Sequence, residues 1–240
     1  MPSVFEFTLE ASALDELTDL PLPNPGEVDF LGLKPETIIR YVDIGEFEDL
    51  AGTELLSDER RERVERFQVL EDKVRCLVAG LLLRRYVSRK EPRKGPHGKP
   101  YFPDGPFFNL SHSGKYVVLA VSSEDVGVDI EEVRPRSEKI AERCFAAAEQ
   151  DWIDRQKDPV EAFYRLWTAK ESIMKATGEG FNMPPESFRV FPAEAAGQDA
   201  YGKDWYLHWM DLKGHVICLA APETQENLTL EQIHRIDLLQ

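Results

Sequence analysis

The chain has 240 residues, of which 42% are hydrophobic and 30% are charged, an ordinary globular balance for one large domain or two small ones. Its formal net charge of −15 argues against a general nucleic-acid-binding protein. With no long apolar run, no signal peptide and three isolated cysteines without zinc-ligand spacing, it is expected to be a cytoplasmic protein without a membrane partner and with reduced thiols.

The first half of the chain predicts strands and two consecutive helices. A strand at 4–9 precedes a proline-rich loop and a strand at 38–44. Ser57 is a typical N-cap for a helix ending near residue 67, and a second helix with an apolar stripe covers 70–87. A turn and strand at 95–102, a loop carrying Ser111 and His112, and a buried strand at 116–121 follow.

The second half repeats this order. Helices are predicted at 137–144, at 145–156 and from about 160 to Gly178, followed by strands at 188–191, 205–211 and 216–221. Lys213 and Gly214 form a hairpin signal, and 233–239 could add an edge strand. Each half predicts a helix on a small antiparallel sheet, so we expect an α+β fold of two similar subdomains, 1–125 and 126–240, with a ligand in their shared cleft.

Two acidic side chains share one face of a predicted strand. Val126, Val128 and Ile130 alternate with Gly127, Asp129 and Glu131, and this period of two places both carboxylates on the same side. Adjacent carboxylates repel each other, and a hard cation such as Mg²⁺ would stabilise them. The alternative is a solvated face on an edge strand.

The long helix after residue 160 carries a third acid. Glu171 lies on the same helical face as Lys175, one turn away, opposite an apolar stripe. Glu171 is therefore placed to be a third metal ligand. The alternative is an ordinary surface ion pair between Glu171 and Lys175.

A local basic segment interrupts the overall acidity. Between residues 84 and 99 a single acid, Glu91, accompanies seven basic residues: Arg84, Arg85, Arg89, Lys90, Arg93, Lys94 and Lys99. A solvated basic loop would explain this composition. The neighbouring GKP and SHS segments favour binding of a polyanionic ligand instead.

Four segments together carry a resemblance to a known family. They are GKP at 98–100, FNLSHSG at 108–114, GVDIE at 127–131 and LWTAKESIMK at 166–175. In order and spacing they resemble the Sfp-type (group II) 4'-phosphopantetheinyl transferases, which move phosphopantetheine from coenzyme A to a serine of a carrier protein. The similarity runs from about residue 57 to 183. It implies two pseudo-twofold-related subdomains in one polypeptide and activity of the holo-[acyl-carrier-protein] synthase type, with release of adenosine 3',5'-bisphosphate.

The resemblance also implies roles for individual residues. Mg²⁺ would be held by Asp129, Glu131 and Glu171, and the catalytic residues would be Glu171, Lys175 and His112, with Glu171 as proton acceptor. Coenzyme A would be bound by Arg60, Arg63, Arg75, Lys99, Ser111, His112, Lys170 and Lys175. Arg60 and Arg63 depart from the lysine that is frequent there, although a guanidinium also binds phosphate well. Lys170 falls toward the apolar side of its helix.

The expected partners are coenzyme A and an apo carrier protein, with no nucleic acid, and the chain is expected to act as a monomer. Carrier docking could use the basic surface or apolar side chains such as Phe181 and Met183, for which ordinary packing is the alternative. Two other functions would suit the same residues. One is a Mg²⁺-dependent hydrolase of nucleotide diphosphates, and the other is a non-catalytic coenzyme A binding module.

Overall fold

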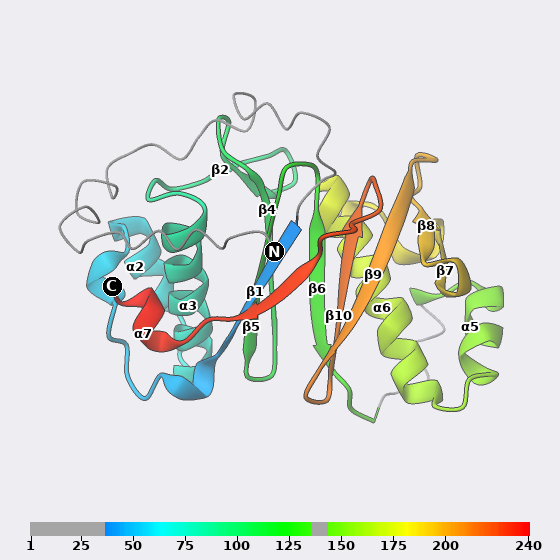
Figure 1. The fold of residues 1–240 in the computed structure, drawn as a ribbon, viewed down its shortest axis with the longest axis horizontal. Helices are drawn as coiled ribbons and strands as arrows, with labels where there is room; N and C mark the ends of the chain where they lie inside the picture. Colours follow the sequence, from blue (N-terminus) through cyan, green and yellow to red (C-terminus); the bar gives the residue numbers. More distant parts are fainter. Residues whose placement is uncertain (1–36, 136–143) are drawn as a thin grey trace, which may run out of the picture.

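The structure is a computed structural model that describes residues 37–135 and 144–240. Two β-sheets lie between two groups of helices (Figure 1). The first sheet has the order β11-β1-β5-β4 and consists of β1 (Thr37–Asp43), β4 (Phe107–Ser113), β5 (Tyr116–Ser122) and β11 (Thr229–Gln232). The second has the order β6-β10-β9-β8-β7 and consists of β6 (Gly127–Glu132), β7 (Arg189–Phe191), β8 (Ala196–Gln198), β9 (Asp204–Leu212) and β10 (His215–Ala221).

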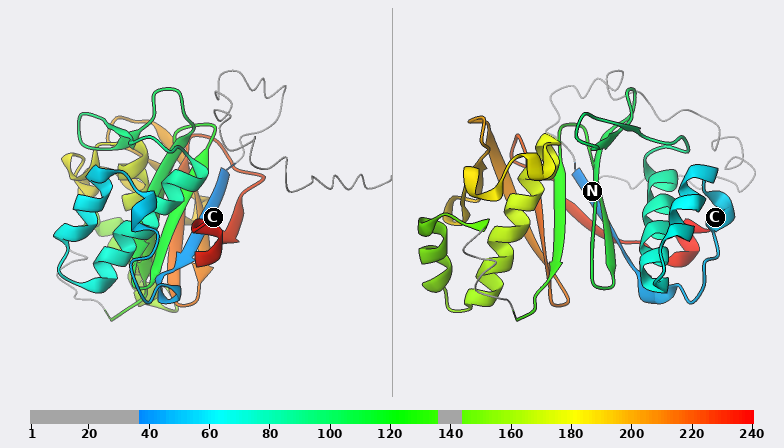
Figure 2. Two further views of the ribbon diagram at one scale, coloured as in Figure 1. Left: turned by 90° about the vertical axis from the view of Figure 1, so that its left-hand side faces the viewer. Right: turned by 180° about the vertical axis from the view of Figure 1, so that it is seen from behind.

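The helices lie on the outer faces of these sheets (Figure 2). They are α2 (Asp58–Arg66), α3 (Leu70–Tyr86), α5 (Ala147–Asp154), α6 (Pro159–Thr177) and α7 (Arg235–Leu238). A two-stranded ribbon, β2 (Arg93–Lys94) with β3 (Pro100–Tyr101), follows α3. None of the helices in the described residues combines the length and apolarity that a membrane crossing requires.

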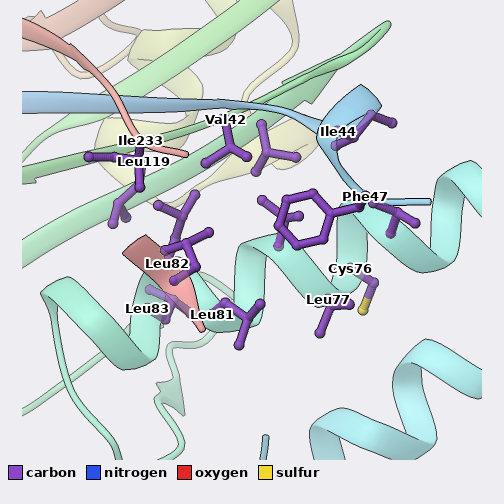
Figure 3. Packing of buried hydrophobic residues seen from close by; sticks show 14 of the residues in the cluster. Val42, Ile44, Phe47, Cys76, Leu77, Leu81, Leu82, Leu83, Leu119 and Ile233 are labelled. Atoms are coloured by element: carbon purple, nitrogen blue, oxygen red, sulfur yellow. The ribbon is translucent and has the colours of Figure 1, made fainter. Parts of the chain in front are cut away.

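Helix α3 packs on the first sheet because this contact removes its apolar side chains from water. Leu77 and Leu82 are fully buried and belong to one cluster with Val42 of β1 and Leu119 of β5 (Figure 3). Burying a leucine side chain contributes roughly 1.5–3 kcal/mol, so this stripe fixes the helix on the sheet. The N-cap predicted at Ser57 is confirmed, since its hydroxyl accepts a hydrogen bond from the Arg60 amide at the start of α2.

Helix α6 covers the second sheet in the same way. Asp158 caps its start, Pro159 occupies its first turn, and Gly178 ends it with a left-handed φ of 79°. Leu166 and Ile173 are fully buried on its inner face. Two helix-on-sheet units in one chain confirm the predicted α+β fold.

A third cluster joins the two sheets. It includes Ile39 of β1, Val118 of β5, Val128 of β6 and Leu219 of β10, all of them fully buried. The hairpin predicted at Lys213 and Gly214 connects β9 to β10, and both residues have positive φ angles of 45° and 82°. Such angles are those of the hairpin turns that match strand twist.

The end of the chain differs from the predicted edge strand at 233–239. The strand is β11, which pairs in parallel with β1, and helix α7 follows it. The strand ends there because the Asp237 carboxylate accepts a hydrogen bond from the His234 amide and so starts the helix. The division into 1–125 and 126–240 stays a prediction, and the residues of β11 and α7 lie with the first sheet and α3.

Three further predicted elements are not seen as predicted. The strand at 4–9 and the helix at 137–144, apart from its last residue, lie outside the described residues. The loop predicted around Ser111 and His112 is wrong, because both residues belong to strand β4, which pairs with β5 along its whole length. This difference has consequences for the site.

Candidate active site

The seam between the two sheets is made by side chains of strand β4. Alternate residues of β4 reach across to β6: Asn109 accepts a hydrogen bond from the Val128 amide at 3.0 Å, and Ser113 accepts one from the Glu132 amide at 3.1 Å. Between them, Ser111 donates to the Asp129 carboxylate at 2.8 Å. This arrangement aligns the two edge strands, so the side chains of both sheets meet in one place.

Asp129 is the centre of the site. Its Oδ1 accepts hydrogen bonds from Ser111 of β4 and, at 2.6 Å, from Lys175 Nζ of α6. Lys175 Nζ also donates to Ser111 Oγ at 2.9 Å and lies 3.9 Å from Glu171 Oε2. Asp129 is only 3% exposed, and its Oδ2 is buried with no hydrogen-bond partner among the described residues. A buried, half-satisfied carboxylate next to an ammonium group is poised to bind a further cation or donor.

Gly127 brings α6 close enough for these contacts. A Cβ atom at this position would lie 2.0 Å from the Ser172 carbonyl oxygen, so only glycine lets the helix backbone lie directly on β6. The Ser172 hydroxyl then donates to the Cys218 carbonyl of β10 at 2.8 Å. Helix α6 is therefore fixed with Glu171 and Lys175 above Asp129.

Glu131 and Glu171 hold their protons more tightly than free carboxylates do. Burial, together with the negative charges of Asp129 and Glu131 and against the opposing effect of Lys175, raises the pKa of Glu171 to about 7. Burial and then the charge of Asp129 raise the pKa of Glu131. Glu131 is held by Ser113, whose hydroxyl donates to its Oε2 at 2.9 Å, and by Trp167 of α6.

The donor set suits a hard cation, although no group of three or more His, Cys, Asp or Glu side chains in the described residues is arranged as a metal cage. Burial and the neighbouring charge of Asp129 raise the pKa values of Glu131 and Glu171, and Asp129 Oδ2 has no hydrogen-bond partner among the described residues, so a bound cation would offset part of this cost. Oxygen ligands of this kind are those that Mg²⁺ prefers.

His112 and Arg75 lie beside this group. His112 is the β4 residue between Ser111 and Ser113. Its pKa is lowered, first by partial burial of the imidazole and then by the positive charges of Arg75 and Lys175. Arg75 of α3 donates from Nε to the Gly114 carbonyl at 3.0 Å and from Nη1 to Asp72 at 2.6 Å. His112 therefore lies within electrostatic reach of both Arg75 and Lys175, and their positive charges favour its neutral form.

Arg60 and Arg63 on α2 lie further away. The Arg60 side chain is 10% exposed, packs over Gly80 of α3 and is 3.9 Å from Glu91. Arg63 is exposed. Both guanidinium groups lie near Cys76, where their charge partly offsets the effect of burial, which raises the pKa of that thiol.

Lys170 lies on the apolar side of α6, as predicted, and its contacts are internal to the protein. Its side chain is fully buried, and its Nζ lies 3.0 Å from Glu149 Oε2 and donates to the carbonyl oxygens of Pro185 and Phe188. These three partners belong to α5 and to the segment before β7. The structure gives Lys170 an internal, structural position, because it lies on the side of α6 that faces its own core.

Lys99 lies at the end of α6. Its Nζ donates to the Ala176 carbonyl at 2.7 Å, and burial lowers its pKa. Lys99 lines a cavity of about 1040 Å³ together with Tyr101, Phe107 and Tyr201. Arg75 and Gly114 line a second cavity of about 630 Å³. Because Phe107 and Gly114 flank β4 at its two ends, the cavities lie at opposite ends of the seam.

The two residues predicted for apolar docking of a carrier protein differ in their exposure to solvent. Met183 is 1% exposed and belongs to the core under α6, which excludes it from a docking surface. Phe181 is 71% exposed.

Asn109 and Ser113, which hold the seam, were not predicted as site residues, and Ser113 also orients Glu131. Their signal was present: Asn109, Ser111 and Ser113 are spaced by two residues, as on one face of a strand. Assigning this segment to a loop concealed that face.

The chain is similar to known proteins of one superfamily. Residues 125–220 match a family model described as the 4'-phosphopantetheinyl transferase superfamily. The chain is 39% identical over 195 residues to 4'-phosphopantetheinyl transferase Sfp of Bacillus subtilis, covering 73% of this chain and 87% of that protein. It is 37% identical to 4'-phosphopantetheinyl transferase gsp of Aneurinibacillus migulanus (56% of this chain, 61% of that protein) and 38% identical to a putative 4'-phosphopantetheinyl transferase of Synechocystis (53% and 59%). The chain thus belongs to the 4'-phosphopantetheinyl transferase superfamily, as its resemblance to the Sfp type predicted.

Proposed function

We propose that the protein transfers 4'-phosphopantetheine from coenzyme A to a serine hydroxyl of an apo carrier protein and releases adenosine 3',5'-bisphosphate. One observation supports this most directly: Ser111 of β4, Asp129 of β6 and Lys175 of α6 meet at a single carboxylate oxygen. These residues come from the three segments that match the transferase motifs. The reaction needs cationic groups at the diphosphate and a proton acceptor at the serine.

Glu171 is the proton acceptor in this proposal. A serine hydroxyl is a weak nucleophile until its proton is removed, and a base works best when its pKa lies near the working pH. The pKa of Glu171, raised by burial to about 7, suits that role. Lys175, whose ammonium group already lies between Asp129 and Glu171, would stabilise negative charge on the phosphate being transferred.

Asp129, Glu131 and Glu171 would hold Mg²⁺ in this proposal. When bound, the ion would neutralise charge that develops on the leaving diphosphate oxygen. Ser113 and Trp167 would keep the Glu131 carboxylate in place, since both contact it from neighbouring elements.

Coenzyme A would lie along the seam. Arg75 and His112 would contact its phosphates, whose negative charge would favour the protonated imidazole, with Arg60 and Arg63 on α2 beyond them. We further propose a cytoplasmic monomer in which two similar subdomains share this cleft.

One assay tests the proposal and separates it from two alternatives. The protein is incubated with coenzyme A, Mg²⁺ and an apo carrier protein, and the carrier is weighed by mass spectrometry. Addition of phosphopantetheine to the carrier supports the transferase. Release of free phosphopantetheine without any carrier would indicate a Mg²⁺-dependent hydrolase instead. Binding of coenzyme A with an unchanged carrier would indicate a non-catalytic binding module.

A further inference from the structure

A large cavity opens at the end of the seam that Phe107 marks. It has a volume of about 1040 Å³ and lies between the β2–β3 ribbon, the end of α6 and the loop before β9. Its lining includes three aromatic side chains that are open to solvent: Tyr101 is 42%, Phe107 44% and Tyr201 70% exposed. Exposed apolar surface gathered in one hollow is typical of a place where another group binds.

The rim of this cavity carries unpaired positive charge. Arg89, Lys90, Arg93 and Lys94 are all exposed, and none of them forms an ion pair with another described residue. Lys94 lines the cavity, and Arg93 lies opposite Tyr101 across the β2–β3 ribbon. These four basic residues, the basic rim, therefore lie next to the exposed aromatic rings.

The acids of the cavity do not offset the basic rim, because each already has a partner. Asp199 is buried and accepts hydrogen bonds from two main-chain amides of its own loop. Glu179 Oε2 lies 3.3 Å from His97 Nε2, and Asp125 Oδ1 lies 4.0 Å from Lys99 Nζ. The cavity and its rim therefore suit a segment that combines apolar side chains with several negative charges.

The chain enters the described part of the protein close to this cavity. Thr37, the first residue of β1, pairs with Ser122 of β5, and Ser122 pairs on its other side with Phe107 of β4. Neighbouring strands lie about 4.8 Å apart, so Thr37 and Phe107 are separated by about 10 Å. Because residues 1–36 are joined to β1 at this point, their docking in the cavity is intramolecular and needs only weak contacts.

The composition of residues 1–36 matches the cavity and its rim. The segment contains eight acidic residues and a single basic one, Lys34. It also contains three phenylalanines and seven leucines. We propose that residues 1–36 dock in the cavity and on the basic rim, with their acids against the rim and their apolar side chains against the exposed aromatic rings.

This docking makes the segment autoinhibitory. Lys99 lines the same cavity, and the family resemblance implies that it binds a phosphate of coenzyme A. Acids of the docked segment compete with that phosphate, so coenzyme A has to displace residues 1–36 before it binds. The autoinhibition rests on the proposed transferase function, whereas the docking does not.

Carbodiimide coupling tests the docking without any turnover. The reagent joins a carboxylate to a lysine amine only where the two are in contact, and mass spectrometry of the digested full-length protein identifies the joined residues. We expect links from the acids of residues 1–36 to Lys90 and Lys94. Lys157 and Lys213 are the controls, since both are exposed and lie outside the cavity lining. Their links to residues 1–36 should be at least about tenfold fewer, because only a docked segment is concentrated at one surface.

A mixture of isotope-labelled and unlabelled protein shows whether the segment and the cavity belong to one chain. Links that join labelled to labelled or unlabelled to unlabelled peptides support the proposal. Links between labelled and unlabelled peptides would mean that a second copy fills the cavity, and equal linkage of the test and control lysines would mean that residues 1–36 have no docking site. Either result would overturn the proposal, as would the absence of links to Lys90 and Lys94.

The autoinhibition is tested in a full-length variant in which three acids of the segment become amides, Asp15→Asn/Glu16→Gln/Asp19→Asn. A ligand binds more weakly when only a fraction of the protein has its site open, so opening the cavity should lower the KM for coenzyme A by roughly 3- to 10-fold. The kcat should stay unchanged, because the segment does not contact the reacting groups. Links to the basic rim should also decrease.

A control variant makes the same change in net charge at three exposed acids outside the cavity lining, Asp151→Asn/Asp154→Asn/Glu194→Gln, and should keep the original KM. An unchanged KM in the segment variant would refute the autoinhibition, and an equal decrease in both variants would do the same, since net charge alone would then explain it. A protein that forms the expected links but transfers no phosphopantetheine would refute the proposed function and leave the docking established.

Discussion

Lys170 Nζ and Glu149 Oε2 lie 3.0 Å apart in a part of the protein where the Lys170 side chain is completely buried and Glu149 is only 6% exposed. The Glu149 carboxylate also accepts hydrogen bonds from the Ala146 and Val190 amides. One ion pair thus ties α6 to α5 and to β7.

This pair predicts that Lys170 acts on stability and not on coenzyme A binding. Removing one member of a buried ion pair leaves the other charge without its partner, so Lys170→Met should lower the free energy of unfolding by about 3–5 kcal/mol. Urea denaturation measures this change. Lys203→Met is the matched control, since this lysine is exposed and lies over the Trp205 ring, so its removal should change stability much less. A stable Lys170→Met protein with a raised KM for coenzyme A would contradict the structural role.

Asp129→Asn should abolish most of the activity. The change removes the charge that holds Lys175 and the buried oxygen that is free for a cation, so kcat/KM should fall by at least about 100-fold, as for other electrostatic groups at reacting centres. Phosphopantetheine transfer followed by mass spectrometry gives the rate. Asp125→Asn changes a partly exposed acid outside the seam and should keep nearly full activity. Transfer at the unmodified rate by Asp129→Asn would refute the proposed mechanism.

Ser113→Ala should weaken metal binding. Loss of the hydroxyl removes a hydrogen bond that orients Glu131, and partners of metal ligands typically contribute about 10- to 100-fold in metal affinity. Titration with Mn²⁺ followed by electron paramagnetic resonance measures the affinity directly, without turnover. Ser113→Thr keeps the hydroxyl and should retain most of the affinity. Equal Mn²⁺ affinity in the alanine variant would show that Glu131 needs no such support.

The raised pKa of Glu171 predicts a pH-dependent stability in metal-free protein. Its carboxyl group has a pKa of about 7 in the folded state against a usual value of 4.5, so the folded state binds its proton more tightly. The stability that the protonated Glu171 carboxyl group contributes to the folded state is fully present below pH 4.5 and is lost as the pH rises to about 7. Glu131, whose pKa is also raised, adds a loss of the same sign.

Glu171→Gln should therefore make the free energy of unfolding depend less on pH. Between pH 4.5 and about pH 7 the metal-free variant should lose less unfolding free energy than the unmodified protein, by on the order of 2 kcal/mol. Urea denaturation in the presence of a chelator at several pH values measures both curves. Identical slopes in the two proteins would mean that Glu171 titrates at its usual pKa.

Much of the fold follows from local patterns in the sequence. The caps at Ser57 and Gly178, the apolar stripe of α3 and the turn at Lys213 and Gly214 act over a few residues, so they could be recognised without knowledge of the rest of the chain. The alternation of Asp129 and Glu131 with apolar residues likewise indicated a strand with its acids on one side, as β6 has them. The family segments added the order in which these elements belong to one site.

Tertiary structure alone decided which of these residues meet. Ser113 and Glu131 contact each other only because two sheet edges lie together, and Gly127 allows α6 to approach β6 so closely. Lys170 and Lys175 are both lysines of one helix, yet one is buried against α5 and the other reaches Asp129. At about 100° per residue, a separation of five residues leaves the two side chains pointing about 140° apart. Side-chain identity and periodicity are local properties, whereas partners far apart in the chain depend on how the sheets pack.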